Sequence, residues 1–249
     1  AWIPSDMRIP RLYVNAQLDA GPSVSLDEPQ GHYLSKVLRM EAGRELQIFN
    51  GDGKEYRATI TKVDKRAVEI AVLSGAEINR ESPLHTHLAI GISRGERMDW
   101  VLQKATELGV SEITPLFTER TEVRLQGERL EKKMQHWRQI TLSACEQCQR
   151  NVPPQVLPAQ DISSFLPQHN SALKLVLHHR SEQTLRQLPT PSSVTLLVGP
   201  EGGLSEREIE SAMRQSGYSA LTLGPRVLRT ETAPVAALVA VQMLWGDLS

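Results

Sequence analysis

The sequence predicts a small β-barrel followed by an α/β domain with a mostly parallel sheet. Residues 11–74 contain short segments in which apolar and polar residues alternate with a period of two, as in half-buried strands. After residue 84 the pattern changes to apolar runs separated by helical stretches. Strands that are apolar on both faces and separated by helices indicate a parallel sheet that is covered on both sides. Residues 76–83, a polar segment that ends in Pro83, are interpreted as an interdomain linker.

The expected barrel contains five short strands and one helix. The strands are expected at residues 11–14, 23–26, 45–49, 56–60 and 67–72. Asn50-Gly51-Asp52-Gly53 joins two of them and supplies residues that tolerate a positive φ, which is a strong hairpin signal. The helix is expected over residues 32–40, with Lys36 and Arg39 pointing away from its apolar face. That face is formed by Leu34, Val37 and Leu38.

The expected α/β domain alternates strands with helices. Strands are expected at residues 84–92, 112–117, 173–177, 194–198 and 220–223. Helices are expected at residues 96–108, 128–149, 181–188, 206–216 and 231–245. The last helix is apolar nearly all round, so it is expected to be buried in the core or in a subunit interface. Sheets of this kind bind ligands outside the carboxyl ends of their strands, which is where we expect the site.

The composition excludes several classes of protein. Of the 249 residues, 40% are hydrophobic, which excludes a disordered chain. No apolar run approaches the roughly 18 residues of a membrane span, and residues 1–8 lack the regions of a signal peptide, so we expect a cytoplasmic protein without a membrane partner. The 28 Lys and Arg residues balance 29 Asp and Glu residues, so any nucleic-acid site must be local.

The two cysteines do not indicate a metal site. Cys145 and Cys148 have helical i, i+3 spacing, but no second pair and no histidine at ligand spacing accompanies them. Two cysteines cannot form a disulfide framework either, so we expect reduced, buried or half-buried thiols. We therefore expect no metal.

The most informative segment runs from Leu196 to Glu208, where a buried strand enters a turn rich in glycine. Three glycines free this turn from Cβ restrictions, so the backbone can approach a ligand closely. Ser205 and Glu208 then have the spacing of a capping box for the next helix. The segment matches neither the P-loop nor the nicotinamide-binding fingerprint. A glycine-rich turn before a well-capped helix, with no ligand, explains these residues equally well.

A second segment, from Leu221 to Ala233, repeats this layout one βα unit later. Its strand ends in Gly224-Pro225, two arginines follow, and Thr230 can then cap the last helix. Arg226 and Arg229 could be solvated loop charges, which is usual for a surface arginine. Their place at the carboxyl end of a strand favours a binding role.

The paired segments resemble the motifs of the ribosomal RNA small subunit methyltransferase E family. Gly199-Pro200-Glu201-Gly202-Gly203 is followed by Leu223-Gly224-Pro225-Arg226-Val227-Leu228-Arg229-Thr230-Glu231-Thr232-Ala233. The resemblance covers nearly the whole chain from Met7 and extends to residues 7–11, 32–40, 93–98, 104–110 and 144–151. The departures are small: Pro234 directly follows the last motif, and Gln149 stands where a glycine is frequent.

The resemblance implies a SPOUT-class enzyme that transfers a methyl group from S-adenosylmethionine to N3 of a uridine in 16S, the small-subunit ribosomal RNA. It implies a PUA-like RNA-binding barrel over residues 7–76 and a methyltransferase domain over residues 84–249, whose last strands and loops form a trefoil knot. Knots are rare, so periodicity alone would predict an ordinary doubly wound sheet. Family members are homodimers with the cofactor site near the interface. The implied RNA partner is the assembled small subunit, with free RNA left open.

The resemblance places S-adenosylmethionine among three loops. Backbone groups there would bind the adenine edge, and apolar side chains would cover the flat base. The expected cofactor residues are Leu177, His178, Val198, Gly199, Pro200, Glu201, Gly202, Gly203, Leu223, Gly224, Val227, Leu228 and Arg229.

Three residues are expected to take part in catalysis. Uridine N3 must lose its proton to become nucleophilic, and Glu201 or solvent could remove it. Arg94 or Arg229 could stabilise the negative charge that spreads onto the carbonyl oxygens. Glu201 could equally be a carboxylate at a helix N-terminus or a hydrogen-bond partner that fixes the knot.

RNA contacts are expected from basic residues in segments that match the family. These residues are Arg8, Arg11, Lys36, Arg39, Arg97 and Arg150. Their phosphate contacts would supply affinity without sequence readout. A solvated charged surface explains any one of them equally well.

Two other functions are left open, and the first of them comes from another class of protein. One is a non-catalytic RNA-binding or ribosome-assembly protein that kept the fold, and the other is an enzyme of this fold that acts on transfer RNA. The intact glycine and arginine loops argue against the loss of cofactor binding. The barrel ahead of the α/β domain argues against the transfer-RNA enzyme.

Overall fold

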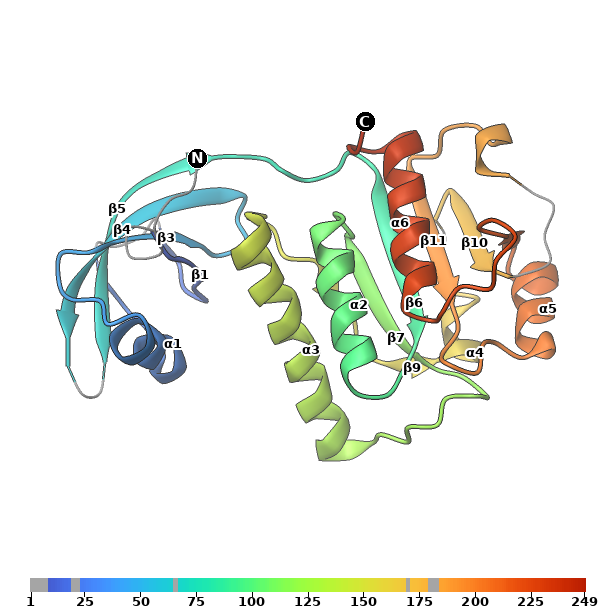
Figure 1. Ribbon diagram of the computed structural model, residues 1–249, viewed down its shortest axis with the longest axis horizontal. Helices are drawn as coiled ribbons and strands as arrows, with labels where there is room; N and C mark the ends of the chain where they lie inside the picture. Colours follow the sequence, from blue (N-terminus) through green and yellow to red (C-terminus); the bar gives the residue numbers. More distant parts are fainter. Residues whose placement is uncertain (1–8, 19–22, 65–66, 169–170, 179–183) are drawn as a thin grey trace. The chain divides into compact units, whose positions relative to one another are not determined.

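The computed structural model describes residues 9–18, 23–64, 67–168, 171–178 and 184–249, which form two compact units (Figure 1). The first unit comprises residues 1–80 and 145–152, and the second comprises residues 81–144 and 153–249. The expected linker overlaps the first boundary, although strand β5 (Val68–Glu77) includes its first two residues. Within the described ranges, no helix is long and apolar enough to cross a membrane.

A five-stranded sheet forms the first unit, in the order β1-β3-β4-β5-β2. Its strands are β1 (Arg11–Tyr13), β2 (Ser23–Ser25), β3 (Glu45–Phe49), β4 (Lys54–Val63) and β5. β1 pairs parallel with β3, and the other pairs are antiparallel. The expected hairpin joins β3 to β4, and Gly51 and Gly53 adopt φ angles of 93° and 91°. All five expected strands are confirmed, with β4 and β5 longer than expected.

The helix expected at residues 32–40 differs from the one observed. Asp27 caps a short helix α1 (Glu28–His32), which continues as a π-helical turn, η2 (Tyr33–Val37). The wider turn is closed by a bond from Leu38 N–H to Tyr33 O of 2.9 Å, and it rotates the following residues. Leu34 is therefore buried, whereas Val37 and Leu38 are exposed instead of sharing its face.

A parallel sheet in the order β12-β10-β11-β6-β7-β8 forms the centre of the second unit, and β9 also pairs with β7. Its strands are β6 (His85–Gly91), β7 (Glu112–Phe117), β8 (Gln155–Val156), β9 (Gln160–Asp161), β10 (Leu173–Leu177), β11 (Ser193–Val198) and β12 (Ser219–Leu221). Leu196 and Leu197 on β11 belong to two different core clusters, one on each face. This explains why β11 has apolar residues on both of its faces.

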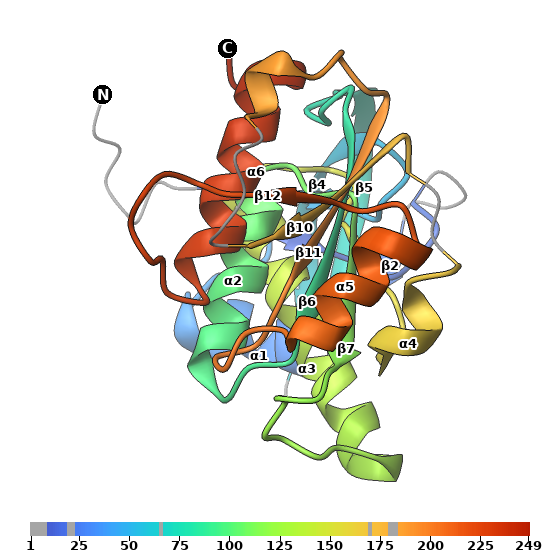
Figure 2. The same ribbon diagram turned by 90° about the vertical axis from the view of Figure 1, so that its right-hand side faces the viewer.

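Helices cover both faces of this sheet. They are α2 (Glu96–Glu107), α3 (Gly127–Cys148), α4 (Ile162–Phe165), α5 (Glu206–Gln215) and α6 (Thr232–Trp245), with a short 3₁₀ turn η3 (Leu185–Gln187). One core cluster contains residues of α2, α3 and α6, and the opposite cluster contains residues of α4 and α5. Figure 2 shows α2 and α6 on one side of the sheet and α5 on the other. The helix expected at residues 181–188 is present only as η3, since residues 179–183 lie outside the described ranges.

The last helix is buried along one face only. Ala237, Leu238 and Val241 are completely buried, but Met243 is 59% exposed and Leu244 is also exposed. The apolar residues of α6 therefore do not all lie in the core of this chain.

Candidate functional site

The three loops expected to hold the cofactor lie at one edge of the parallel sheet. β10 lies between β11 and β12, so the carboxyl ends of all three strands meet there. His178 N–H donates to Leu221 O at 2.9 Å, and the Thr222 hydroxyl donates to His178 O at 2.6 Å. The Thr230 hydroxyl donates to Pro200 O at 3.4 Å, which joins the segment after β12 to the glycine-rich turn after β11. The predicted grouping of these loops is therefore present.

Thr230 does not cap the last helix as expected. The residue that precedes α6 is Glu231, and its side chain makes no capping hydrogen bond. Because the Thr230 hydroxyl is turned toward Pro200 O, it is used between two loops rather than at the helix end.

The glycine-rich turn after β11 needs glycine for a steric reason. A Cβ added to Gly199 would lie 2.6 Å from Leu204 N, a backbone atom that cannot move aside. Gly203 has a φ of 74° and donates its N–H to Pro200 O at 2.8 Å. The capping box expected for α5 is confirmed, since both reciprocal bonds between Ser205 and Glu208 are present.

The apolar side chains expected to cover the adenine base differ in exposure. Val227 is 90% exposed, and Leu223 and Leu228 are half-buried. Leu177, at the end of β10, is also half-buried, and Gly224 is exposed. The Val198 side chain is instead packed in the core, so any contact it makes with a ligand must come from its backbone.

An open cavity of about 610 Å³ lies beside the glycine-rich turn. It is lined by Arg94, Glu96, Arg97, Glu122 and Glu201. Glu201 Oε1 accepts the Arg94 N–H at 2.6 Å and lies 3.8 Å from Arg97 Nη1. Of the roles open to Glu201, this geometry supports that of a hydrogen-bond partner, which here ties the turn to the residues before α2.

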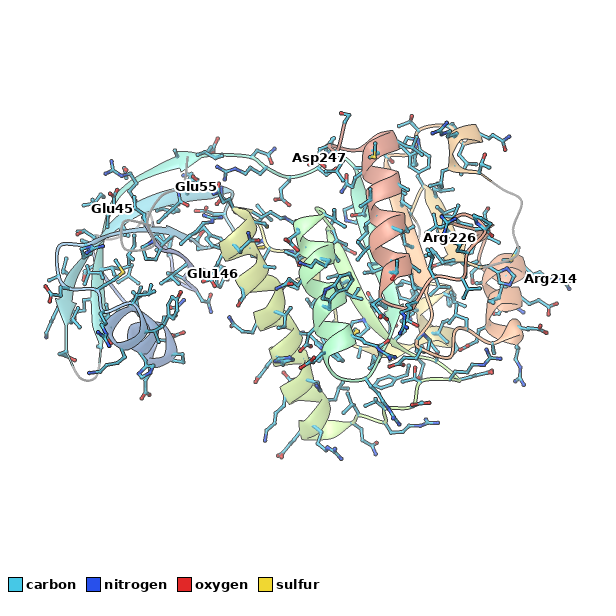
Figure 3. The ribbon with its side chains drawn as sticks, in the orientation of Figure 1. Glu45, Glu55, Glu146, Arg214, Arg226 and Asp247 are labelled. Atoms are coloured by element: carbon cyan, nitrogen blue, oxygen red, sulfur yellow. The ribbon has the colours of Figure 1, made fainter. Side chains whose placement is uncertain are left out.

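The arginines of the second loop are exposed. Arg226, labelled in Figure 3, follows Gly224, whose φ is 73°. The Arg229 carbonyl accepts the N–H groups of Thr232 and Ala233, at 3.0 and 3.1 Å, while its side chain is exposed. Both guanidinium groups are thus available to a ligand.

A turn over residues 118–122, directly after β7, also contacts this site and was not among the expected residues. Arg120 Nη1 donates to Gly202 O at 2.9 Å, and Glu122 pairs with Arg94 at 3.0 Å. The sequence held a signal for it, because these charged residues follow an apolar strand at the same edge of the sheet.

The residues expected to contact RNA fall into three groups. Lys36 and Arg39 in the first unit are exposed, and Arg97 in the second unit lines the cavity. Arg8 lies outside the described residues. Arg150 is buried and the side chain of Arg11 is only 7% exposed, so neither guanidinium is open to a phosphate and both are removed from the expected RNA surface.

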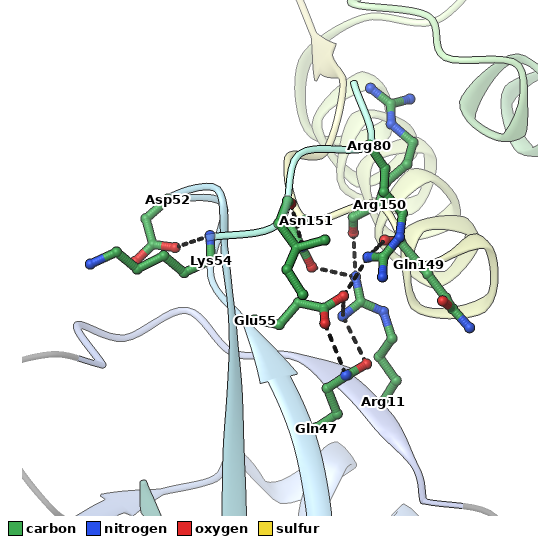
Figure 4. A network of polar contacts seen from close by, with 10 residues as sticks. Arg11, Gln47, Asp52, Lys54, Glu55, Arg80, Gln149, Arg150 and Asn151 are labelled. Atoms are coloured by element: carbon green, nitrogen blue, oxygen red, sulfur yellow. Dashed lines mark hydrogen bonds and ion pairs between the residues drawn. The ribbon is translucent and has the colours of Figure 1, made fainter. Parts of the chain in front are cut away.

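Arg11 instead belongs to a polar network inside the first unit (Figure 4). Its Nη2 atom donates to Arg150 O at 2.6 Å and to Asn151 Oδ1 at 2.8 Å, and Glu55 lies 3.8 Å from its Nη1 atom. Glu55 also pairs with Arg80. Burial lowers the pKa of Arg11, an effect that the Glu55 charge opposes. The network joins β1 to the segments at residues 78–80 and 149–151, where the chain passes between the units.

Gln149 and the cysteines lie in the same part of the first unit. Gln149 has a φ of 71°, which explains why a glycine suits this position. Cys145 and Cys148 are thiols, buried and half-buried as expected. In the parts of the chain that the structure describes, no group of three or more His, Cys, Asp or Glu side chains could hold a metal ion.

Known proteins share this fold. Residues 80–242 match the RNA methyltransferase domain family, and residues 26–73 match the RNA methyltransferase PUA domain family. Together with the parallel sheet and its loops, these matches define the class of α/β RNA methyltransferases with an N-terminal PUA-like β domain. A ribosomal RNA small subunit methyltransferase E from Buchnera aphidicola subsp. Schizaphis graminum is 39% identical over 244 residues, covering 97% of this chain and 99% of the relative. The chain belongs to the ribosomal RNA small subunit methyltransferase E family.

Two solved structures of relatives contain the cofactor. A methyltransferase from Legionella pneumophila with bound S-adenosylmethionine superposes with a TM-score of 0.93 at 45% identity, covering 97% of this chain and all of the relative. A ribosomal RNA small subunit methyltransferase E from Neisseria gonorrhoeae, also bound to S-adenosylmethionine, has a TM-score of 0.89 at 39% identity with the same coverage.

Proposed function

We propose that this protein is an S-adenosylmethionine-dependent methyltransferase that modifies N3 of a uridine in 16S, the small-subunit ribosomal RNA. The observation that carries the proposal is the full-length likeness to proteins named ribosomal RNA small subunit methyltransferase E and to structures that contain S-adenosylmethionine. The chain also has the loops and the cavity that such a reaction needs. A ribosomal RNA substrate is in keeping with a cytoplasmic protein.

The residues at the carboxyl edge of the sheet fit S-adenosylmethionine. Gly203 has open space where a Cβ would stand, so a ligand can approach the backbone of the turn at this residue. Leu223, Val227 and Leu228 present apolar surface beside the turn, which suits a flat adenine ring. We propose that all of the expected residues of the three loops bind the cofactor, and that Val198 does so through its backbone.

The reaction is an in-line transfer that needs positioning more than strong acid or base catalysis. The cofactor supplies a methyl group on a sulfonium; the bond from N3 to this carbon forms as the bond from sulfur breaks, and a neutral thioether leaves. Arg94 and Arg229 stabilise the negative charge on the uracil carbonyl oxygens after N3 loses its proton. Glu201 already accepts the Arg94 N–H, so we assign it to positioning, and the N3 proton passes to solvent.

RNA is held by basic residues on each unit. Arg97 lies beside the cavity, and Lys36 and Arg39 are exposed in the PUA-like unit. Contacts of this type bind phosphates irrespective of sequence, so base identity must be read inside the cavity. Arg8 remains a candidate on sequence alone.

We also propose that the C-terminal segment forms the knot typical of SPOUT enzymes. After β11 the chain forms α5 on one face and β12 beyond β10, and it then returns to the opposite face as α6. Residues 222–231 must therefore pass the carboxyl edge of the sheet. Their bonds to His178 O and Pro200 O suit a segment that runs between the other two loops.

A homodimer would cover the apolar surface that α6 leaves open. Met243 and Leu244 on α6 and Trp100 on the neighbouring α2 are all exposed. Apolar side chains in such numbers suit an interface better than solvent. We propose that a second copy of the chain packs there.

The test measures cofactor binding and methyl transfer together. Wild-type protein is titrated with S-adenosylmethionine by calorimetry and is then incubated with unmodified small ribosomal subunits or free 16S RNA. A methyl group on N3 blocks base pairing, so the product is detected as a stop in primer extension. We expect one binding site per chain and a single new stop that depends on the cofactor.

Two variants make this experiment specific. Leu228→Asp places a charge against the expected adenine site and should abolish both signals. Leu73→Asp, an exposed residue of β5, serves as the matched control and should keep both. Cofactor binding without any methyl transfer to either substrate would contradict the proposed substrate, and a folded wild type that does not bind would contradict the enzyme itself.

A further inference from the structure

The turn at residues 118–122 is a rigid part of the second unit. The Thr121 N–H donates to Thr118 O at 3.1 Å, and the Thr118 N–H donates to the Thr121 hydroxyl at 3.1 Å. Both threonines are buried. The turn therefore holds Glu119, Arg120 and Glu122 in defined places.

Arg120 and Glu119 contact the glycine-rich turn and the helix that follows it. Arg120 Nη1 donates to Gly202 O at 2.9 Å and to Leu204 O at 3.4 Å. A Cβ on Gly202 would lie 3.2 Å from Arg120 Cβ, so the arginine stem lies against this turn. The Glu119 N–H donates to Glu208 Oε2 at 3.1 Å, and Glu208 is the partner of Ser205 in the capping box of α5.

Glu122 contacts the other side of the cavity. Its Oε2 atom lies 3.0 Å from Arg94 Nη2, and the Arg94 N–H donates to Glu201. The side chains of Arg94 and Glu122 are 67% and 59% exposed. The pair uses Arg94 Nη2, so the guanidinium keeps further N–H donors with which it can bind an RNA oxygen while Glu122 holds it.

We infer that the turn at residues 118–122 is a positioning element of the methyl-transfer site, in which Arg120 orders the Gly202–Leu204 backbone for the cofactor and Glu122 orients Arg94 for the RNA. The inference rests on the proposed function. Arg120 acts on the cofactor site and Glu122 acts on the RNA site, so the loss of each side chain must have a different effect on binding and turnover. A turn with only a structural role would alter both partners alike.

The first arm of the test is cofactor affinity measured by calorimetry on the full chain. Arg120→Ala removes a charge-assisted hydrogen bond, and we expect the dissociation constant for S-adenosylmethionine to rise roughly tenfold. Arg120→Lys keeps a cation that can donate to Gly202 O and should recover most of the affinity. Arg124→Ala, an exposed arginine four residues along the same loop, is the matched control and should bind like wild type.

The second arm is steady-state methyl transfer with RNA as the varied substrate. Glu122→Gln removes the ion pair with Arg94, and we expect kcat to fall about fivefold because the arginine loses its orientation. The KM for RNA should stay level or fall, since a negative charge has left the cavity, and the cofactor dissociation constant should be unchanged. Glu128→Gln, an exposed residue in the first turn of α3, is the matched control.

The outcomes separate this inference from the proposed function. A wild type that binds S-adenosylmethionine, with Arg120→Ala binding equally tightly, would overturn the inference alone. It would also be overturned if Glu122→Gln and Arg120→Ala changed cofactor affinity and kcat in the same proportion. A wild type that shows no cofactor binding would overturn the proposed function and this inference with it. Thermal melts of every variant show whether each has folded.

Discussion

Glu146, near the end of α3, is a carboxyl group held in a place that disfavours its charge (Figure 3). Burial raises the pKa of Glu146 above its ordinary value of 4.5, against the opposing effects of the Tyr13 N–H bond and the Arg11 charge. The Tyr13 N–H donates to Glu146 Oε2 at 3.0 Å. The hydrogen bond therefore reduces the cost of burial without removing it.

The expected consequence is a pH-dependent loss of stability. Because the folded-state pKa is raised, the folded protein keeps a proton that the unfolded chain loses, and stability falls as pH rises from about 4.5 through the folded pKa. Glu146→Gln can still accept the Tyr13 N–H, and its Tm should exceed that of wild type increasingly over this window and then level off. Melting curves from pH 4 to pH 8 measure it. Glu131→Gln, exposed on the same helix, should show no such trend, and a Glu146→Gln difference independent of pH would contradict the assignment.

At the scale of elements, the turn between β11 and α5 combines local and steric constraints. Its helix end is stabilised by the Ser205–Glu208 capping box, which depends only on neighbouring residues. Its beginning depends on the close approach of Gly199 to Leu204 N. The turn is therefore a fixed backbone surface rather than a flexible glycine loop.

A single methyl group should disturb this surface. Gly199→Ala forces backbone atoms apart, and we expect a loss of about 1–3 kcal/mol in unfolding free energy together with weak or absent binding of S-adenosylmethionine. Chemical denaturation and calorimetry measure the two effects. Gly43→Ala has a φ of 94° and open space around the new Cβ, so it should reduce stability by about 1 kcal/mol while leaving cofactor binding unchanged. Normal binding by Gly199→Ala would show that the close approach is unimportant.

At the scale of the molecule, the helices on the two faces of the parallel sheet differ in how many large apolar side chains they leave exposed. The helices on one face, α4 and α5, leave Met213 exposed, while α2 and α6 on the other face leave Trp100, Met243 and Leu244 exposed. This asymmetry is the physical basis for the proposed dimer. It also accounts for a final helix with almost no polar side chains.

The dimer can be tested with two equivalent substitutions on opposite faces. Met243→Asp on α6 should convert the protein to a monomer, because a charge in an apolar interface is strongly unfavourable. Met213→Asp on α5, where the methionine is 42% exposed, should leave the dimer intact. Sedimentation equilibrium gives the mass of each. A wild-type monomer, or a Met243→Asp variant that is still dimeric, would contradict the proposed interface.

Sequence patterns predicted the strands and helices more reliably than the roles of single charged residues. The alternating and continuous apolar runs correctly predicted the longer strands of both units, since each strand is made of adjacent residues. The two-residue strands β8 and β9 were not predicted, because they are too short to show a pattern. The π-helical turn at Tyr33–Val37 was not predicted, because the pattern of apolar residues in this segment also fits an ordinary helix. Because an ordinary helix was assumed, Val37 and Leu38 were wrongly predicted to lie on the buried face with Leu34.

What the sequence determined by itself is therefore local: the order of strands and helices, the glycine-rich turn, and the cap of α5. What only the tertiary structure decided is which charges are buried and which face the cavity. Arg11 bonds to Arg150 across 139 positions of sequence, and Arg120 bonds to Gly202 across 82. An arginine has the same side chain in a buried network and on an RNA surface. Its role is set by the acceptors that folding brings to it, and distant acceptors leave no periodic pattern along the chain.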